Sequence, residues 1–325
     1  MISFATSDST IWNRDQFIID VVTEMINGSP TILLDTNGEG PCATSLGLYT
    51  LLDSLCLRFG YNKQSITLQT CNLAEHHSEY NVSLVPQVVY LNSARRYLTP
   101  DTKKNWNTIK HFGHFIGHGN LHRLSTASTL HKEYADKTVQ TYHCDPTDPY
   151  HRSFIGLEEM MFNGTTSEEI DAAIELIKQS PITQDSINEY PILNPVTLNI
   201  TKLYPTFFVE VVNLTYWSGD TFYLDEKIWR PILMRTPFIV QGPQHFIPRL
   251  RKLGFRTFFD YWDEGYSQDP ASCHTPAIHT ILQDLASKTT VELQNMYSSM
   301  TDSLEHNYNL FRTITKSQLY AVCQS

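Results

Sequence analysis

Apolar positions in the first hundred residues alternate between helical spacing and short continuous runs. Helical spacing covers 14–28 (RDQFIIDVVTEMING), which ends at an Asn-Gly stop signal, and 42–60 (CATSLGLYTLLDSLCLRFG). The continuous runs TILLDT (31–36) and SITLQT (65–70) are typical of strands that are covered on both faces. Strands separated by helices predict a parallel, doubly wound sheet.

A polar stretch at 97–108 (YLTPDTKKNWNT) interrupts this alternation. After it, the spacing predicts strands at 110–117, 137–143 and 206–213, helices at 121–134 and 166–180, and two amphipathic helices near 276–298 and 301–318. With 325 residues the chain is long enough for two domains. We therefore expect a Rossmann-like domain at 1–108, a second domain at 109–275, and C-terminal helices at 276–325 that pack back on the domains.

Composition narrows the class of protein. Hydrophobic residues make up 41% and charged residues 18%, as in ordinary globular proteins. The formal net charge is -10 and no Lys/Arg run exceeds a pair, which disfavours a large nucleic-acid footprint but leaves room for a local groove. Six scattered cysteines without a CxxC pair predict reduced, mostly buried thiols. Because no signal peptide or long apolar run is evident, we expect a cytoplasmic protein without a membrane span.

The loops that follow the predicted strands carry the candidate chemistry, because ligands of open parallel sheets bind beyond the carboxyl ends of the strands. The loop GHGNLHR (117–123) opens a predicted helix, whose N-terminus favours an anion, and Arg123 could hold a phosphate there. The glycines let the backbone approach a ligand. A tight turn with a surface arginine fits the same residues, because the motif is a weak signal.

The segment YLDEKIWRPIL (223–233) places polar residues at a predicted helix start. Asp225 can cap the helix, Glu226 suits the helix dipole, and Lys227 follows it. A carboxylate there could accept both ribose hydroxyls while the ammonium neutralises a diphosphate. A solvated helix start with a routine charge pair fits equally well. Pro231 is expected to kink the helix unless regular helix begins later.

Candidates for a general base lie at the mouth of the first domain. They are Glu39 in NGEGP and the pair Glu75 and His76 after SITLQT, and polar loop residues without a catalytic role are the alternative. Asp145 and Asp148 in CDPTDPYH could hold a divalent metal, but proline-rich aspartate segments are usually turns, and we assign no metal.

Together these residues resemble nucleotide-sugar glycosyltransferases. The string SGDTFYLDEKIWRPILMRTPFIVQGP resembles the nucleotide-binding half of the α1,3-fucosyltransferase family, where a Thr-Glu-Lys segment opens a helix and an apolar strand ending in Gly follows. HFIGHGNLHRLSTASTL resembles the strand, Asn-containing loop and helix with an early Arg of that family, most closely in fucosyltransferase-like proteins of phages and marine microbes. The resemblance covers about 109–266. Asp225 stands in place of the family's Thr, and His118 where the phage-type loop often has Arg, so the donor sugar stays open.

The resemblance implies a GT-B-like fold, in which two Rossmann-type domains face each other across a cleft. It implies that Glu226 binds the nucleotide ribose, that Lys227 and Arg123 bind the diphosphate, and that Gly117 and Asn120 belong to the same nucleotide-binding loop.

The activity implied is the inverting, metal-independent transfer of a sugar from a nucleotide-diphosphate sugar to a hydroxyl acceptor such as a glycan, without a cofactor. Glu39, or failing it Glu75 or His76, would take the acceptor proton. Two other classes stay open. One is a non-catalytic nucleotide- or glycan-binding module of the same fold. The other is a DNA-modifying phage-type glycosyltransferase in a host cytoplasm, against which the acidic balance argues.

Overall fold

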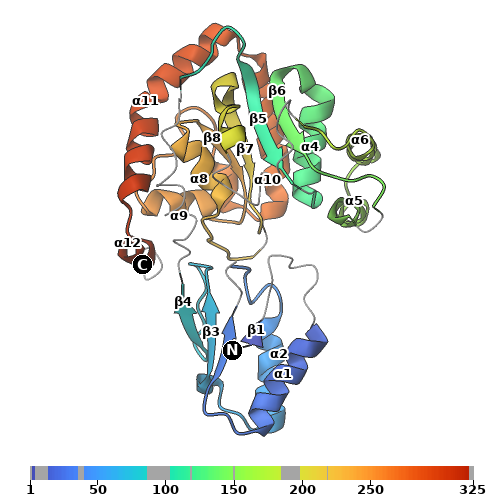
Figure 1. Cartoon of the computed structure of the whole chain (residues 1–325), viewed down its shortest axis with the longest axis vertical. Helices are drawn as coiled ribbons and strands as arrows, with labels where there is room; N and C mark the ends of the chain where they lie inside the picture. Colours follow the sequence, from blue (N-terminus) through green and yellow to red (C-terminus); the bar gives the residue numbers. More distant parts are fainter. Residues whose placement is uncertain are drawn as a thin grey trace.

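The computed structural model describes residues 2–3, 14–35, 40–85, 103–117, 119–148, 151–183, 198–217 and 219–321. Within them, the strands form two four-stranded sheets, and every pairing between these strands is parallel (Figure 1). The first sheet has the order β1-β2-β3-β4, with β1 Ile2–Ser3, β2 Ile32–Asp35, β3 Ile66–Thr70 and β4 Asn81–Leu84. The second has the order β6-β5-β7-β8, with β5 Lys110–Ile116, β6 Thr138–Tyr142, β7 Phe207–Asn213 and β8 Phe238–Gln241. The predicted α/β class with parallel sheets is confirmed.

In the described part of the first unit, the helices α1 (Arg14–Ile26) and α2 (Leu48–Phe59) accompany the sheet. Their apolar faces pack on the strands around a core that includes Phe17, Val21, Leu34, Leu52 and Leu68. Burial of these side chains is the main favourable contribution to the stability of this unit.

The helix predicted at 42–60 is shorter in the structure, because α2 begins only at Leu48. Gly47 adopts a left-handed conformation with φ of 70°, which ends the preceding turns rather than continuing a helix. The N–H of Ala43 donates to the carboxylate of Glu75 at 3.0 Å, 32 residues away in sequence, so a tertiary contact holds this turn.

The other described helices belong to the second unit, and helices cover both faces of its sheet (Figure 1). They are α4 Leu121–Glu133, α5 Arg152–Phe162, α6 Ser167–Lys178, α7 Leu198–Thr201, α8 Glu226–Leu233, α9 Phe246–Lys252, α10 His274–Ser287, α11 Thr290–Thr313 and α12 Lys316–Ala321. The core of this unit includes Val211, Ile228, Ile239, Leu282 and Phe311. Among these helices, α5, α7 and α9 have no counterpart in the sequence-based prediction, and neither do the short strands β1 and β4 of the first sheet.

The C-terminal helices pack on the second sheet, α10 against α4 and β8, and α11 against α8. The predicted break between them, at 299–300, is wrong, because it falls at Lys288–Thr289. There the hydroxyl of Thr289 accepts the N–H of Glu292 at 3.3 Å, and the carboxylate of Glu292 accepts the N–H of Thr289 at 2.7 Å. This reciprocal capping box starts a new helix at Thr290.

The loop after β3 meets the loop between β7 and α8, and so joins the two units (Figure 1). Asn72 accepts the N–H of Phe222 at 2.8 Å and donates to the carbonyl of Asp220 at 3.0 Å. The N–H of Leu73 donates to the carbonyl of Phe222 at 2.8 Å. Gly219, with φ of 71°, lies so close to the first unit that a Cβ there would come within 1.9 Å of the Ser45 hydroxyl.

Among the described residues, every helix is too short or too polar to span a bilayer.

Candidate functional site

The start of α8 lies immediately beyond the carboxyl edge of the second sheet, after the loop that leaves β7. Asp225 has extended backbone and its carboxylate accepts the N–H of Lys227 at 3.0 Å, so it caps the helix as the sequence predicted. Behind the cap, Ile228, Trp229 and Ile232 are buried in the core of the second unit. This apolar face fixes the direction in which the polar residues of the first turn project.

Polar neighbours hold the ammonium of Lys227 at this helix start. It donates to the hydroxyl of Thr215 at 3.0 Å and to the second carboxylate oxygen of Asp225 at 3.2 Å. The side chains of Lys227 and Asp225 are 7% and 2% exposed, so the ion pair is almost wholly removed from water. A buried ion pair of this kind contributes little net free energy of folding, because the cost of removing both charges from water offsets their attraction.

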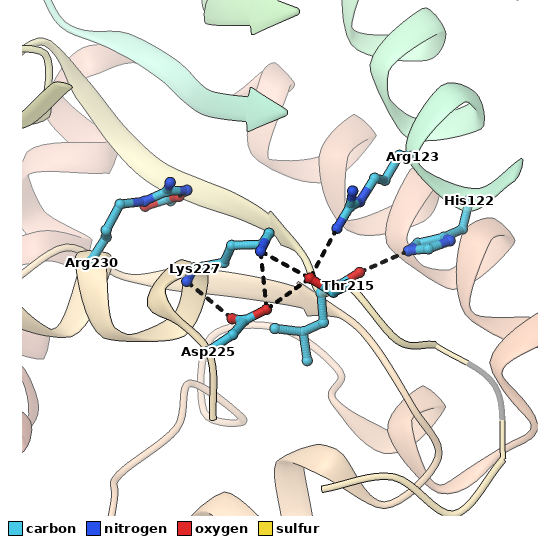
Figure 2. A network of polar contacts seen from close by, with 8 residues as sticks. His122, Arg123, Thr215, Asp225, Lys227 and Arg230 are labelled. Atoms are coloured by element: carbon cyan, nitrogen blue, oxygen red, sulfur yellow. Dashed lines mark hydrogen bonds and ion pairs between the residues drawn. The ribbon is translucent and has the colours of Figure 1, made fainter. Parts of the chain in front are cut away.

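Arg123 reaches the same hydroxyl from the other side of the sheet edge (Figure 2). It lies in the first turn of α4, where the amide oxygen of Asn120 accepts its backbone N–H at 3.2 Å and caps the helix. Its guanidinium makes a long contact of 3.5 Å to the hydroxyl of Thr215, and the residue is 1% exposed. The structure therefore brings together the two predicted phosphate ligands, 104 positions apart in sequence, on one threonine.

This cluster carries two cations and one carboxylate close to a single hydroxyl. Low solvent access strengthens every charge interaction in it, so an anion that replaces the contacts to Thr215 would experience a strong field. An extended dianion, such as a diphosphate, has enough oxygen atoms to accept from a guanidinium and an ammonium together. The arrangement suits anion binding rather than nucleophilic catalysis.

Thr215 was not identified from the sequence, although it stands two positions after the end of the strand TFFVEVVN, where ligand-binding side chains of parallel sheets gather. Asp225 was identified as a cap, whereas its contact with the Lys227 side chain was not. His122 was also missed; its imidazole lies 3.2 Å from the carbonyl oxygen of Leu214.

The other residues assigned to nucleotide binding are Gly117, Asn120 and Glu226. Gly117 follows β5, and the side chain of Asn120 is engaged in capping α4. The N-terminus of α4 is largely occupied by protein groups, because Glu159 accepts the N–H of Leu121 at 3.3 Å. The backbone of Glu226 forms the first residue of α8, and its side chain lies outside the described residues. A phosphate at this site would therefore contact the Arg123 side chain rather than the helix end.

The general-base candidates of the first unit differ in accessibility. Glu75 is 7% exposed and accepts from the Ala43 N–H at 3.0 Å, the Tyr49 hydroxyl at 3.1 Å and the Asn72 amide at 3.2 Å. Burial raises the pKa of Glu75, against the opposing effect of these donors. His76 is exposed, with Nδ1 3.2 Å from the carbonyl oxygen of Ala74. Glu39 lies outside the described residues.

A buried polar network supports the carboxyl edge of the second sheet. The imidazole of His114 donates to the amide oxygen of Asn213 at 2.5 Å, and the amide of Asn213 donates to Gln241. Gln241 also accepts from the hydroxyl of Thr126 and donates to that of Thr275, both at 2.7 Å. Burial lowers the pKa of His114 to about 4, so this histidine is neutral at physiological pH. The network ties three strands to α4 and α10 and thereby limits movement of the strand ends.

A second network lies beneath α8. Arg230 donates to the carboxylate of Glu210 at 2.9 Å, and the hydroxyl of Tyr204 donates to its other oxygen at 2.6 Å. Nearby, the amine of Lys104 donates to the carbonyl of Tyr204 at 2.7 Å and to the hydroxyl of Thr236 at 2.9 Å. Burial raises the pKa of Glu210 and lowers that of Lys104 to about 7. These groups anchor the helix that presents Lys227.

The lowered pKa of Lys104 predicts that stability rises with pH in the alkaline range. Between the folded pKa of about 7 and the ordinary lysine value of 10.5, the unfolded chain binds a proton that the folded chain does not. The stability that the protein gains from keeping the Lys104 amine neutral is therefore complete above the unfolded pKa and is lost as pH falls towards 7. We expect the free energy of unfolding, measured with urea, to rise by about 2 kcal/mol from pH 7 to pH 9 relative to Lys104→Met. Parallel pH profiles of the two proteins would contradict this.

A surface hollow of 550 Å³ runs between α4 and α6 and is lined by His131, Lys132, Ser167, Glu168, Asp171, Ala172, Glu175 and Gln179. It includes neither Arg123 nor Lys227.

Within the described residues, no group of three His, Cys, Asp or Glu side chains is placed to hold a metal ion. Asp145 accepts the N–H and hydroxyl of Thr147 at 2.9 and 2.6 Å, which makes CDPTDPYH a side-chain-stabilised turn at this point.

Compared with models of known families, with curated proteins and with solved structures, the chain matches none of them. Fold and site together define an α/β protein with two parallel sheets and a buried cation pair at the carboxyl edge of the second.

Proposed function

We propose that the protein is a glycosyltransferase that moves a sugar from a nucleotide-diphosphate sugar to a hydroxyl acceptor. The observation that carries this proposal is the meeting of the Arg123 guanidinium and the Lys227 ammonium on the hydroxyl of Thr215. They project from two different helices at the strand edge where parallel sheets bind their ligands. The resemblance of 109–266 to the fucosyltransferase family supports the same assignment.

In this proposal the two parallel-sheet units are the two domains of a GT-B-like fold. The second unit binds the nucleotide-sugar and the first binds the acceptor. The acceptor oxygen attacks the anomeric carbon while the bond from that carbon to the phosphate oxygen breaks. Negative charge then develops on the departing diphosphate, where Arg123 and Lys227 stabilise it. Asp225 holds the ammonium of Lys227 in position through its contact at 3.2 Å.

The acceptor proton must pass to a base on the first unit. Among the described candidates, His76 is accessible, whereas Glu75 is buried and accepts three hydrogen bonds. Glu39 also remains part of the proposal as a base. The resemblance implies that the configuration at the anomeric carbon is inverted and that no metal ion takes part.

A thermal-shift screen against nucleoside diphosphates tests the binding part of the proposal. A ligand present at 100 times its Kd stabilises the native state by about 2.7 kcal/mol, which raises the melting temperature by several degrees. We expect at least one nucleoside diphosphate to produce this shift and the corresponding nucleoside to produce much less. An unchanged melting temperature across the whole panel at millimolar concentration would contradict the proposal.

Turnover separates an enzyme from a binding module of the same fold. Purified protein is incubated with the nucleotide-sugars of the nucleotides that bind, and release of the nucleoside diphosphate is measured with and without sugar acceptors. Binding without any release would assign the chain to the non-catalytic class.

A further inference from the structure

An aromatic pair lies beside the cation cluster on the loop that leaves β7. The indole of Trp217 stacks on the imidazole of His122, with ring centroids 4.9 Å apart and an interplanar angle of 31°. The imidazole is itself fixed by its contact of 3.2 Å with the carbonyl oxygen of Leu214. His122 is 1% exposed, whereas Trp217 is only partly buried, so part of the indole faces solvent.

This ring pair and the cation pair share the same short stretches of chain. Trp217 follows Thr215 by two residues, and His122 directly precedes Arg123. Two residues of extended chain span at most about 7 Å, so the backbone of Trp217 lies close to that of Thr215, on whose hydroxyl the cations meet. A ligand with a flat apolar ring at one end and a dianionic group at the other would match this order of groups.

We infer that Trp217, supported by His122, is a stacking subsite for the base of a nucleoside diphosphate whose phosphates lie at Arg123 and Lys227. This inference rests on the proposed function and extends it, because it assigns the part of the ligand that the cations do not contact. Every nucleobase has a flat face that stacks on an aromatic side chain, so the subsite would recognise a base without selecting strongly among bases. The imidazole behind the indole restrains its rotation, which reduces the entropy lost when the base binds.

The experiment measures the affinities of nucleoside diphosphates and of inorganic pyrophosphate by titration calorimetry. Wild-type protein is compared with Trp217→Ala, Trp217→Phe and a control, Trp106→Ala. Trp106 is also partly buried and contacts an aromatic ring, that of Tyr297, edge to face with ring centroids 5.5 Å apart, but it precedes β5 and lies away from the strand ends that carry the cluster. All four proteins are first checked for folding by circular dichroism and thermal unfolding.

We expect Trp217→Ala to weaken nucleoside diphosphate binding about tenfold and to leave pyrophosphate binding unchanged, because only the base has lost its contact. Trp217→Phe keeps an aromatic face and should retain most of the affinity. Trp106→Ala should bind both ligands like the wild type.

Three results would overturn the inference. If Trp217→Ala binds both ligands as the wild type does, the indole has no role and the proposed function stands. An equal loss for nucleoside diphosphate and pyrophosphate would mean that the substitution disturbs the cation cluster rather than a base subsite. If the wild type binds neither ligand, the proposed function fails together with the inference.

Discussion

Lys227→Ala is expected to reduce sugar transfer about 100- to 1000-fold, the loss seen when one preorganised charge-stabilising group is removed from an active site. Its ammonium lies 3.0 Å from the Thr215 hydroxyl and 3.2 Å from the Asp225 carboxylate in a nearly water-free setting. Arg123→Ala should have an effect of the same order, because its guanidinium approaches the same hydroxyl. The measurement is the rate of nucleoside diphosphate release from the nucleotide-sugar that wild-type protein turns over.

Both substitutions remove buried groups, so loss of fold must be distinguished from loss of function. Lys132→Ala is the matched control, because Lys132 forms an exposed ion pair with Glu168 on α4 and α6 at 2.6 Å. It should retain wild-type rates and stability, since exposed ion pairs contribute little. Arg123→Lys keeps the charge and should lose less activity than Arg123→Ala. Folded Lys227→Ala and Arg123→Ala proteins with near-normal rates would refute the assignment of these residues.

Arg230→Met is expected to lower the free energy of unfolding by about 3–5 kcal/mol, because it leaves a buried carboxylate without its cation. The side chains of Arg230 and Glu210 are 5% and 1% exposed and lie 2.9 Å apart. Tyr204 continues to donate to Glu210 in the variant, but a hydroxyl cannot replace the guanidinium charge. Urea unfolding at pH 7 measures the change.

A double substitution separates the loss of the pair from the exposure of one partner. Arg230→Met combined with Glu210→Gln removes both charges, and we expect it to recover part of the stability lost in Arg230→Met. Lys132→Met, which breaks the exposed pair with Glu168, should change stability by less than about 1 kcal/mol. If Arg230→Met is as mild as this control, the pair does not anchor α8.

Much of the secondary structure could be predicted because its signals are local. The run TFFVEVVN forms a buried strand, TILLDT forms a strand that is buried at alternate positions, and Thr166 caps α6 through the Glu169 N–H at 3.3 Å. The helix start at Asp225 was also predictable, because a cap acts within two or three residues. The predicted helix bounds were wrong where contacts with residues distant in sequence, or an irregular apolar pattern, decide the structure. The turn before α2 is held by Glu75, and α5 carries exposed apolar residues such as Phe162 that obscure its amphipathic pattern.

The candidate site was predictable in its residue types and not in its geometry. Arg123 and Lys227 were recognisable because each follows a predicted strand and stands at a helix start. Nothing in the local pattern specifies that both cations approach one hydroxyl, that Asp225 pairs with the Lys227 ammonium, or that Trp217 stacks on His122. Each of these contacts depends on the spatial order of the strands.

Hydrophobic periodicity and capping residues, which act over a few positions, sufficed to establish the α/β class, the parallel strands and the places where most helices begin. The order β6-β5-β7-β8 is a property of the folded chain, and it sets the exits of β5 and β7 side by side at one edge. The contacts of Asn72 with residues 220–222 likewise join segments that lie about 150 positions apart. Such contacts form only when burial of the whole core offsets the entropy of closing long loops, and for that reason short-range patterns do not contain them.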